Sequence, residues 1–191
     1  MKLNAKELRT VDEADIQEKL KTLKRQPIYF ILENIYDTYN IGGIFRLADA
    51  IGVSKMYLCG QMEIPPNPKI KKASIGTYKI VPWEYKKTAK EAIEELQDIK
   101  IVAVEQDEKS VPYTQINFIY PFALLFGNET YGVLPETLTL VDQIAEIPMW
   151  GINRSLNVIV SAAIVSYHAM GKMWALSGNR THTLALTKGL F

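Results

Sequence analysis

Short apolar runs without polar alternation recur along this chain and are separated by segments with helical periodicity. Such runs are typical of strands buried on both faces of a sheet, because helices cover both faces of a parallel sheet. The pattern therefore predicts an α/β fold with a mostly parallel sheet flanked by helices. A proline-rich loop is expected over residues 65–68. The expected strands are residues 28–32, 55–59, 99–104, 122–126 and 142–147, with further strand-like residues at 78–83.

Capping residues between the expected strands indicate where helices begin. Thr10 with Glu13, and Thr88 with Glu91, have the spacing of a capping box, in which each side chain can satisfy a free amide at a helix start. Ser155 is expected to cap a long apolar helix near the C-terminus. The expected helices are residues 11–25, 41–51, 89–97 and 156–175.

A chain of 191 residues, 48% of them hydrophobic, can bury a core as one domain. We expect a helical extension over residues 1–26, one main domain over 27–175 and a tail over 176–191. The charged N-terminus lacks a hydrophobic signal region, and the apolar stretch at 158–170 is short for a membrane span. The single cysteine, Cys59, fits a reducing compartment. The expected protein is cytoplasmic and has no membrane partner.

The net charge of +1 predicts that any contact with nucleic acid is local, because wide non-specific binding needs a more basic surface. Residues 67–90 contain seven lysines, a single acid and three interleaved aromatic residues. This segment is a candidate RNA-binding patch, but a solvated surface over a half-buried strand fits its composition equally well. The candidate RNA contacts are Lys69, Lys71 and Lys72.

Three polar, glycine-containing segments are candidates for chemistry, because ligands of parallel α/β folds bind at the carboxyl ends of the strands. Residues 40–46 read NIGGIFR, residues 126–132 read FGNETYG, and residues 147–157 read IPMWGINRSLN. Taken singly, each also has an ordinary interpretation. Arg46 fits a surface arginine, the second segment fits a strand-to-helix turn, and Ser155 fits a helix cap.

Other chemical templates are missing from the sequence. It has neither the G-x-G-x-x-G fingerprint nor a Walker loop, which argues against a nucleotide-dependent oxidoreductase. Two histidines and one cysteine are too few for an ordinary zinc site, so no metal is expected.

Together the three segments contain N-x-G-x-x-R, G-N-E-x-x-G and I-P-M…S-L-N, in that order. In this the chain resembles the SpoU (TrmH-like) RNA methyltransferases of the SPOUT superfamily, over residues 28 to 173. The resemblance implies an α/β SPOUT domain with a deep trefoil knot near the C-terminus, which sequence patterns alone would not suggest. It also implies a homodimer. S-adenosylmethionine would be the cofactor, bound in the knot by Val104, Glu105, Gly127, Ile147 and Leu156.

The implied reaction transfers a methyl group to a ribose 2′-hydroxyl of RNA. Arg46 matches the catalytic arginine of the family, and it would act either as a base or as an electrostatic clamp on phosphate and developing alkoxide. The clamp is physically safer, because arginine keeps its proton. Glu129 would fix Arg46 through a charged hydrogen bond. The matching polar residues around the arginine are Asn40, Glu129, Ser155 and Asn157.

Small members of this family often modify tRNA, and some modify rRNA, so both substrates stay open with tRNA preferred. A non-catalytic RNA-binding protein of the same fold is an alternative, although the intact Arg46, Glu129 and Asn157 argue against it. Methylation of a base rather than a ribose is a further alternative, and the SpoU-type motifs count against that one.

Overall fold

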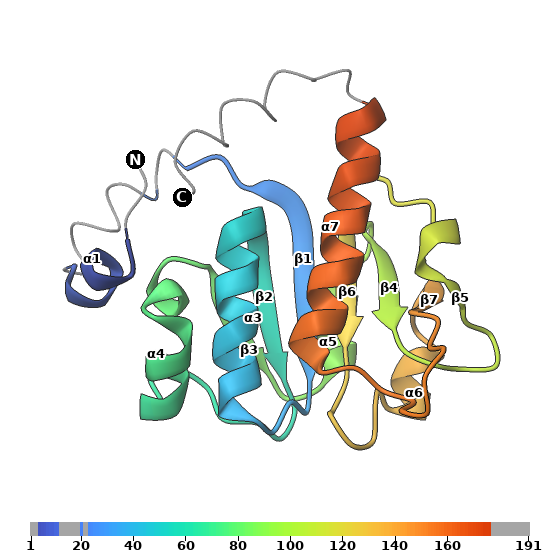
Figure 1. Cartoon of the computed structure of the whole chain (residues 1–191), viewed down its shortest axis with the longest axis horizontal. Coiled ribbons are helices and arrows are strands. Elements are labelled where there is room, and N and C mark those ends of the chain that lie inside the picture. The colour runs from blue at the N-terminus through green and yellow to red at the C-terminus, as the bar shows by residue number, and fades with distance from the viewer. Residues whose placement is uncertain (1–3, 12–19, 21–22, 177–191) are drawn as a thin grey trace.

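The structure is a computed structural model and describes residues 4–11, 20 and 23–176. In this part of the chain a seven-stranded sheet has the order β3-β2-β1-β6-β4-β7-β5, and all of its neighbouring strands are parallel (Figure 1). The strands are β1 (Gln26–Glu33), β2 (Val53–Cys59), β3 (Trp83–Lys86), β4 (Lys100–Val104), β5 (Val111–Pro112), β6 (Phe122–Phe126) and β7 (Gln143–Glu146).

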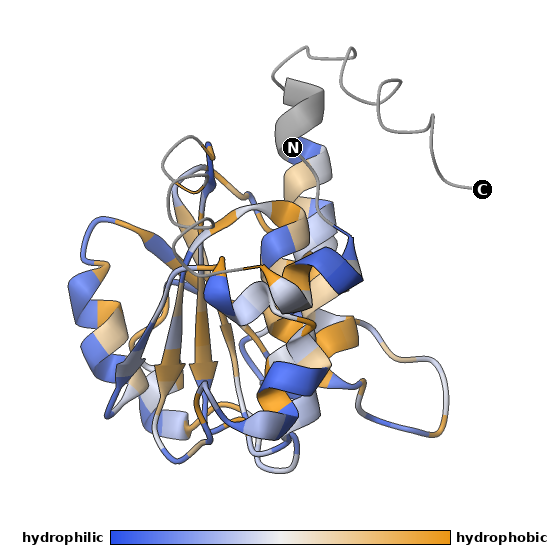
Figure 2. Cartoon of the chain, turned by 90° about the vertical axis from the view of Figure 1, so that its left-hand side faces the viewer, coloured by the Kyte–Doolittle hydropathy of each residue, from blue (hydrophilic) through white to orange (hydrophobic). Residues whose placement is uncertain are grey.

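Helices cover both faces of this sheet, and hydrophobic strands lie between them (Figure 2). Successive residues of β1 are therefore buried on opposite faces of the sheet. Phe30 and Leu32 belong to the apolar cluster under α3 and α7, and Ile31 belongs to the cluster under α5. The predicted parallel α/β fold is confirmed, whereas the strand order alone does not establish the trefoil knot, which stays a prediction. The helices are α1 (Ala5–Thr10), α3 (Thr38–Ile51), α4 (Pro68–Ser74), α5 (Ala89–Glu95), α6 (Pro135–Leu138) and α7 (Val158–Leu176).

The first described helix, α1, lies before the helix predicted over residues 11–25. Asn4 caps α1 and forms the capping box with Glu7, whereas the Thr10 hydroxyl bonds back to main-chain oxygens inside that helix. The backbone is extended at Val11, so the helix predicted to start there is wrong at its beginning. Within the predicted range Leu20 is helical and residues 23–25 are not, and the remainder, residues 12–19 and 21–22, lies outside the described part.

Two further predictions are corrected between β2 and α5. The proline-rich loop leads into α4, because Asn67 caps the helix and proline is well suited to its first turn. The strand expected at 78–83 is displaced: Thr77–Lys79 form a 3-10 helix, and β3 starts only at Trp83. Local propensity could not place this strand, since its position depends on pairing with β2.

The long apolar helix is confirmed, but its cap is not the predicted residue. Asn157 Oδ1 accepts a hydrogen bond from the main-chain N–H of Ile159 at 2.8 Å, so Asn157 rather than Ser155 caps α7. The Ser155 side chain is thereby left available to the surface that precedes the helix. No helix of the described residues is long and apolar enough to cross a membrane.

Helix α3 packs closely on α4 because Gly42 has no side chain. A Cβ atom at Gly42 would lie 2.5 Å from Cβ of Ala73 and 2.8 Å from the main-chain N of Ser74. We expect Gly42→Ala to lower the free energy of unfolding by about 1–3 kcal/mol, as overpacking does. Gly171→Ala is the control, because open space surrounds this glycine inside α7. It should raise stability by roughly 0.5–1 kcal/mol, and equal effects of the two variants in chemical denaturation would contradict this interpretation.

Candidate functional site

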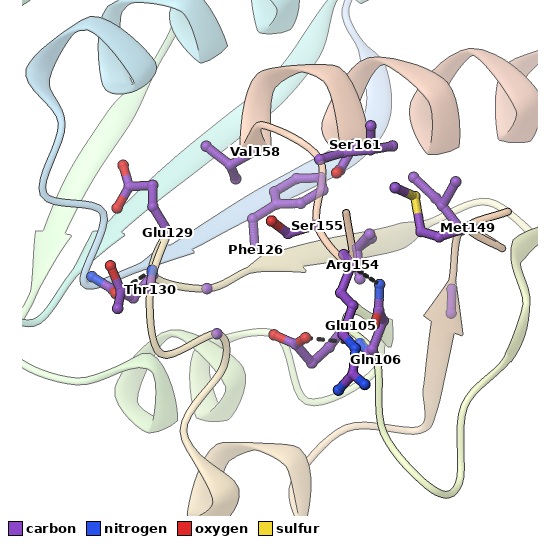
Figure 3. A pocket seen from close by; sticks show the side chains of 17 residues that line it. Glu105, Gln106, Phe126, Glu129, Thr130, Met149, Arg154, Ser155, Val158 and Ser161 are labelled. Carbon is purple, nitrogen blue, oxygen red and sulfur yellow. Dashed lines mark hydrogen bonds between the residues drawn. The ribbon is translucent and has the colours of Figure 1, made fainter. Parts of the chain in front are cut away.

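A hollow of about 360 Å³ lies at the carboxyl ends of β4, β6 and β7 and under the segment that leads into α7 (Figure 3). Its lining combines apolar side chains, Val104, Phe126 and Ile147, with polar ones such as Thr130 and Ser155. All five residues predicted to bind the cofactor line this hollow, although they come from four separate segments of the chain. They are Val104, Glu105, Gly127, Ile147 and Leu156.

The turn after β6 forms one wall of the hollow and requires glycine at its first position. A Cβ atom on Gly127 would lie 2.3 Å from the carbonyl carbon of Gly132 and 2.3 Å from the main-chain N of Val133. The same turn is closed by two main-chain hydrogen bonds of 2.9 Å between Asn128 and Gly132. The backbone doubles back on itself here, and a side chain at position 127 would open the turn.

Glu105 and Gln106 hold the loops around the hollow in place. The Glu105 carboxylate accepts hydrogen bonds from the main-chain N–H groups of Val133, at 2.9 Å, and Gln106, at 2.8 Å. The Gln106 side-chain amide donates to the Arg154 carbonyl at 2.6 Å, as Figure 3 shows. These bonds connect the end of β4 to the turn after β6 and to the segment before α7, so the carboxylate of Glu105 supports the wall.

Asn128 is a structural residue of the site that the sequence reasoning missed. Its side-chain amide donates to the Asn34 carbonyl at 2.7 Å, and its side-chain oxygen accepts from the N–H groups of Thr130 and Tyr131. Asn34 itself has a positive φ of 54° and accepts from the Gln61 N–H at 2.8 Å. An asparagine directly after an apolar strand is a turn signal, but only the structure shows that it ties β1 to this turn.

A second hollow, of about 440 Å³, opens beside the first. A chain of side-chain hydrogen bonds crosses it: the Asn157 amide donates to Asn40 Oδ1 at 3.0 Å, and the Asn40 amide donates to Glu129 Oε1 at 2.9 Å. The structure thus brings together three residues separated by up to 117 positions. The two hollows share Glu129, Thr130, Ser155, Leu156 and Val158.

The Glu129 carboxylate is held at the start of α3. In addition to Asn40, it accepts main-chain hydrogen bonds from Tyr36 and Asp37, both at 3.1 Å. Burial acts to raise the pKa of Glu129, but the hydrogen bonds from Asn40 and from the main chain outweigh burial and lower the pKa below its ordinary value. Glu129 is therefore ionised at neutral pH and is a poor proton acceptor.

Replacement of Asn40 by alanine should raise the pKa of Glu129, because the amide donor that favours the charged carboxylate is lost. In the parent protein the stabilisation from the ionised carboxylate is complete above the ordinary glutamate pKa and is lost as the pH falls through the lowered pKa. In Asn40→Ala that loss should occur at higher pH. Carboxyl ¹³C shifts of Glu129 followed against pH measure it. Asn157→Ala is the control, because Asn157 donates a hydrogen bond to Asn40 and not to Glu129. An equal rise of the Glu129 pKa in Asn157→Ala would contradict the role of the Asn40 amide as the donor that lowers this pKa.

Arg46 lies apart from this cluster. Its side chain is exposed, makes no hydrogen bond or ion pair with the described residues and lines neither hollow. It follows Gly42 and Gly43 by one turn of α3, and these glycines face Ala73 of α4 and Ile159 of α7. Arg46 thus emerges between α4 and α7, on the side of α3 away from the sheet. The expected bond from Glu129 to Arg46 is absent from the structure, because Asn40 and the main chain occupy that carboxylate.

The lysine-rich segment does not form one continuous patch. Lys69, Lys71 and Lys72 are exposed on α4. Lys86, in contrast, is paired with Glu84 at 2.7 Å and with Glu95 at 2.6 Å, so its charge is neutralised locally. The three α4 lysines remain candidates for RNA contact. The described residues contain no group of three or more His, Cys, Asp or Glu side chains that could hold a metal ion.

Residues 27–167 match the family model described as the SpoU rRNA Methylase family, and this match covers well over half of the chain. The chain belongs to the SpoU rRNA methylase family. A tRNA (guanosine(18)-2′-O)-methyltransferase of Thermus thermophilus is 31% identical over 163 residues, which cover 81% of this chain and 79% of that protein. The first and second hollows, which are lined by residues of the three SpoU-type motifs, together form the candidate active site.

Solved structures of related proteins share the fold. The A. aeolicus TrmH/SpoU tRNA modifying enzyme is 28% identical with a TM-score of 0.73, and 86% of each chain is covered. An AdoMet-bound rRNA methyltransferase from Sinorhizobium meliloti is 27% identical with a TM-score of 0.72. That comparison covers 87% of this SpoU chain and 60% of the Sinorhizobium chain.

Proposed function

We propose that this protein is a cytoplasmic methyltransferase that moves the methyl group of S-adenosylmethionine to a ribose 2′-hydroxyl of tRNA. The observation that carries the proposal is the wall common to the two hollows, which contains Glu129, Ser155 and Leu156. A methyl donor in the first hollow and a nucleoside in the second would meet at this wall. Enzymes that transfer a group between two bound molecules need such contiguous sites.

The residues of the first hollow fit S-adenosylmethionine. Its volume of about 360 Å³ lies within the range of small-molecule sites, roughly 300–1,000 Å³. Its apolar lining, including Val104 and Ile147, suits the adenine ring, and its polar lining, including Thr130 and Ser155, suits the ribose and the amino-acid end. When bound, the cofactor supplies an electrophilic methyl group on a sulfonium. Val104, Ile147 and Leu156 would hold it, and the Gly127 turn would admit its close approach.

The residues of the second hollow would orient the ribose. Two hydrogen bonds fix the side-chain amide of Asn40: its oxygen accepts from Asn157, and its nitrogen donates to Glu129. The Ser155 side chain makes no hydrogen bond with the described residues and is free to bond a ribose oxygen. Glu129 positions Asn40 and is a poor acceptor for the ribose proton, because its pKa is lowered, so the proton passes to water when the ribose oxygen takes the methyl group. Arg46 would stabilise the negative charge that develops on the ribose oxygen and bind the neighbouring phosphate.

A homodimer would explain how Arg46 takes part although it lies outside the hollows of its own subunit. Val160 and Tyr167 are 45% and 50% exposed on α7, and with the half-buried Ile164 between them they form an apolar stripe along one side. A second subunit covering this stripe would lie next to the α3–α7 seam, where Arg46 emerges. The arginine would then face the active site of the neighbouring subunit.

Comparison of RNA pools tests the reaction and the substrate class together. Methyl-labelled S-adenosylmethionine is incubated with unmodified tRNA or unmodified rRNA, and the RNA is digested with alkali. Because a 2′-O-methyl group blocks cleavage of the next phosphodiester, we expect label in alkali-resistant dinucleotides from tRNA. Label in rRNA would instead favour rRNA as the substrate, as for the Sinorhizobium meliloti rRNA methyltransferase. Label in mononucleotides would show base methylation, and no label would support a non-catalytic RNA-binding protein.

A further inference from the structure

A third hollow, of about 670 Å³, lies at the carboxyl ends of β1, β2 and β3 and belongs to neither of the two described above. Its outer lining contains polar and aromatic side chains, and part of it comes from the segment between β3 and α5. The residues that matter for its chemistry are Asn34, Tyr36, Gln61, Tyr85, Lys87 and Lys90.

This hollow adjoins the candidate active site at Tyr36. Tyr36 lines both the second and the third hollow, and its main-chain N–H donates to Glu129. The carboxyl ends of parallel strands lie along one edge of the sheet, so the three hollows follow each other along this edge. The order is the proposed cofactor hollow, then the proposed ribose hollow, then the third.

The third hollow combines aromatic surfaces with positive charge. Tyr36 is 54% exposed and Tyr85 is 42% exposed, and the Tyr85 hydroxyl donates to the Gly60 carbonyl at 3.2 Å, which fixes its ring. Lys87 is exposed at the rim, and Lys90 makes only a long, solvent-exposed pair with Glu94 at 3.7 Å.

Two acidic residues also line the hollow, and the carboxylate of one of them is already hydrogen-bonded to neighbouring residues. The buried Glu33 carboxylate accepts bonds from the Leu134 N–H and the Thr137 hydroxyl. Glu136 is exposed on the α6 side. Both acids thus belong to the α6 wall, whereas the lysines and Tyr85 form the wall toward β3 and α5. A nucleotide is the ligand that matches the latter wall, since bases stack on aromatic rings and phosphates pair with lysine.

We propose that the third hollow holds a nucleotide next to the methylated ribose, with its base against Tyr85 or Tyr36 and its phosphate near Lys87 and Lys90. This inference rests on the proposed function, because it places the second hollow as the ribose site. Recognition of an unstacked neighbouring base would make the hollow a determinant of which single-stranded position in the RNA is methylated.

Kinetics with a pool of unmodified tRNA tests the proposal. Tyr85→Ala should raise the KM for tRNA roughly 10-fold, the order expected for one lost stacking contact, and leave the Kd for S-adenosylmethionine unchanged. Tyr85→Phe keeps the ring and should retain a KM close to that of the parent. Lys87→Ala should also raise the KM and reduce its salt dependence, whereas Lys109→Ala, an exposed lysine near β5, should not. Unchanged KM values for both Tyr85→Ala and Lys87→Ala would overturn the proposal.

Crosslinking separates failure of this inference from failure of the proposed function. tRNA carrying 4-thiouridine is irradiated with the parent protein, and the crosslinked peptides are identified by mass spectrometry. Crosslinks to residues 34–36 or 85–90 support the hollow as an RNA subsite even if no methyl transfer is detected. Crosslinks confined to other segments, in a protein that does transfer methyl groups, overturn the inference and leave the proposed function intact.

Discussion

Arg46→Ala is expected to lower kcat for methyl transfer to tRNA by at least about 100-fold, the order observed when one group that stabilises a developing oxyanion is removed. The Kd for S-adenosylmethionine should stay at the parent value, because Arg46 does not line the first hollow. Stability should also change little, since the side chain is exposed and bonds none of the described residues. Single-turnover kinetics, equilibrium cofactor binding and thermal unfolding measure the three quantities.

Arg46→Lys distinguishes the geometry of the guanidinium from its charge. Lysine keeps the positive charge but lacks the planar fork that binds phosphate through two hydrogen bonds, so we expect only partial recovery of kcat. Full recovery would show that charge alone suffices. A parallel loss of cofactor binding in Arg46→Ala would contradict the separation of the arginine from the first hollow and with it the proposed role.

Gly127→Ala is expected to reduce affinity for S-adenosylmethionine by more than about 100-fold. The added methyl group would lie 2.3 Å from main-chain atoms of Gly132 and Val133, and backbone cannot rotate away as a flexible side chain can. The turn would have to open, which displaces one wall of the cofactor hollow. This overpacking should also lower the free energy of unfolding by about 1–3 kcal/mol. Isothermal titration with the cofactor and chemical denaturation measure both effects.

Gly151→Ala is the matched control for this turn. Gly151 lies in another segment near the site, between β7 and α7, and apart from its chain neighbours no heavy atom lies within 4 Å of the position that its Cβ would take. We expect cofactor affinity and stability close to those of the parent. If Gly127→Ala bound S-adenosylmethionine as tightly as Gly151→Ala does, the turn after β6 would not be the wall on which the cofactor hollow depends.

Apolar runs predicted the central strands because burial on both faces of the sheet favours apolar residues, with few exceptions such as Lys55, which pairs with Glu84 and Glu95. Residues 28–32, 55–59 and 122–126 accordingly lie inside β1, β2 and β6. The edge of the sheet was less predictable. β3 has no fully buried residue, so its sequence is not distinctly apolar, and its place depends on main-chain pairing with β2. Thr88 caps α5 as predicted, whereas the caps predicted at Thr10 and Ser155 were misplaced, since several polar residues near those helix starts were eligible.

The sequence by itself determined the chemistry available to the site, because spacing within each of the three motifs is local and the residue types are given. It placed Asn40, Glu129 and Asn157 in the same predicted site. Only the tertiary structure decided their partners: Glu129 holds Asn40 and the start of α3, and not Arg46. Such pairings join residues about ninety or more positions apart, and they depend on how the ends of separate strands meet at one edge of the sheet. No pattern within a single segment carries that information.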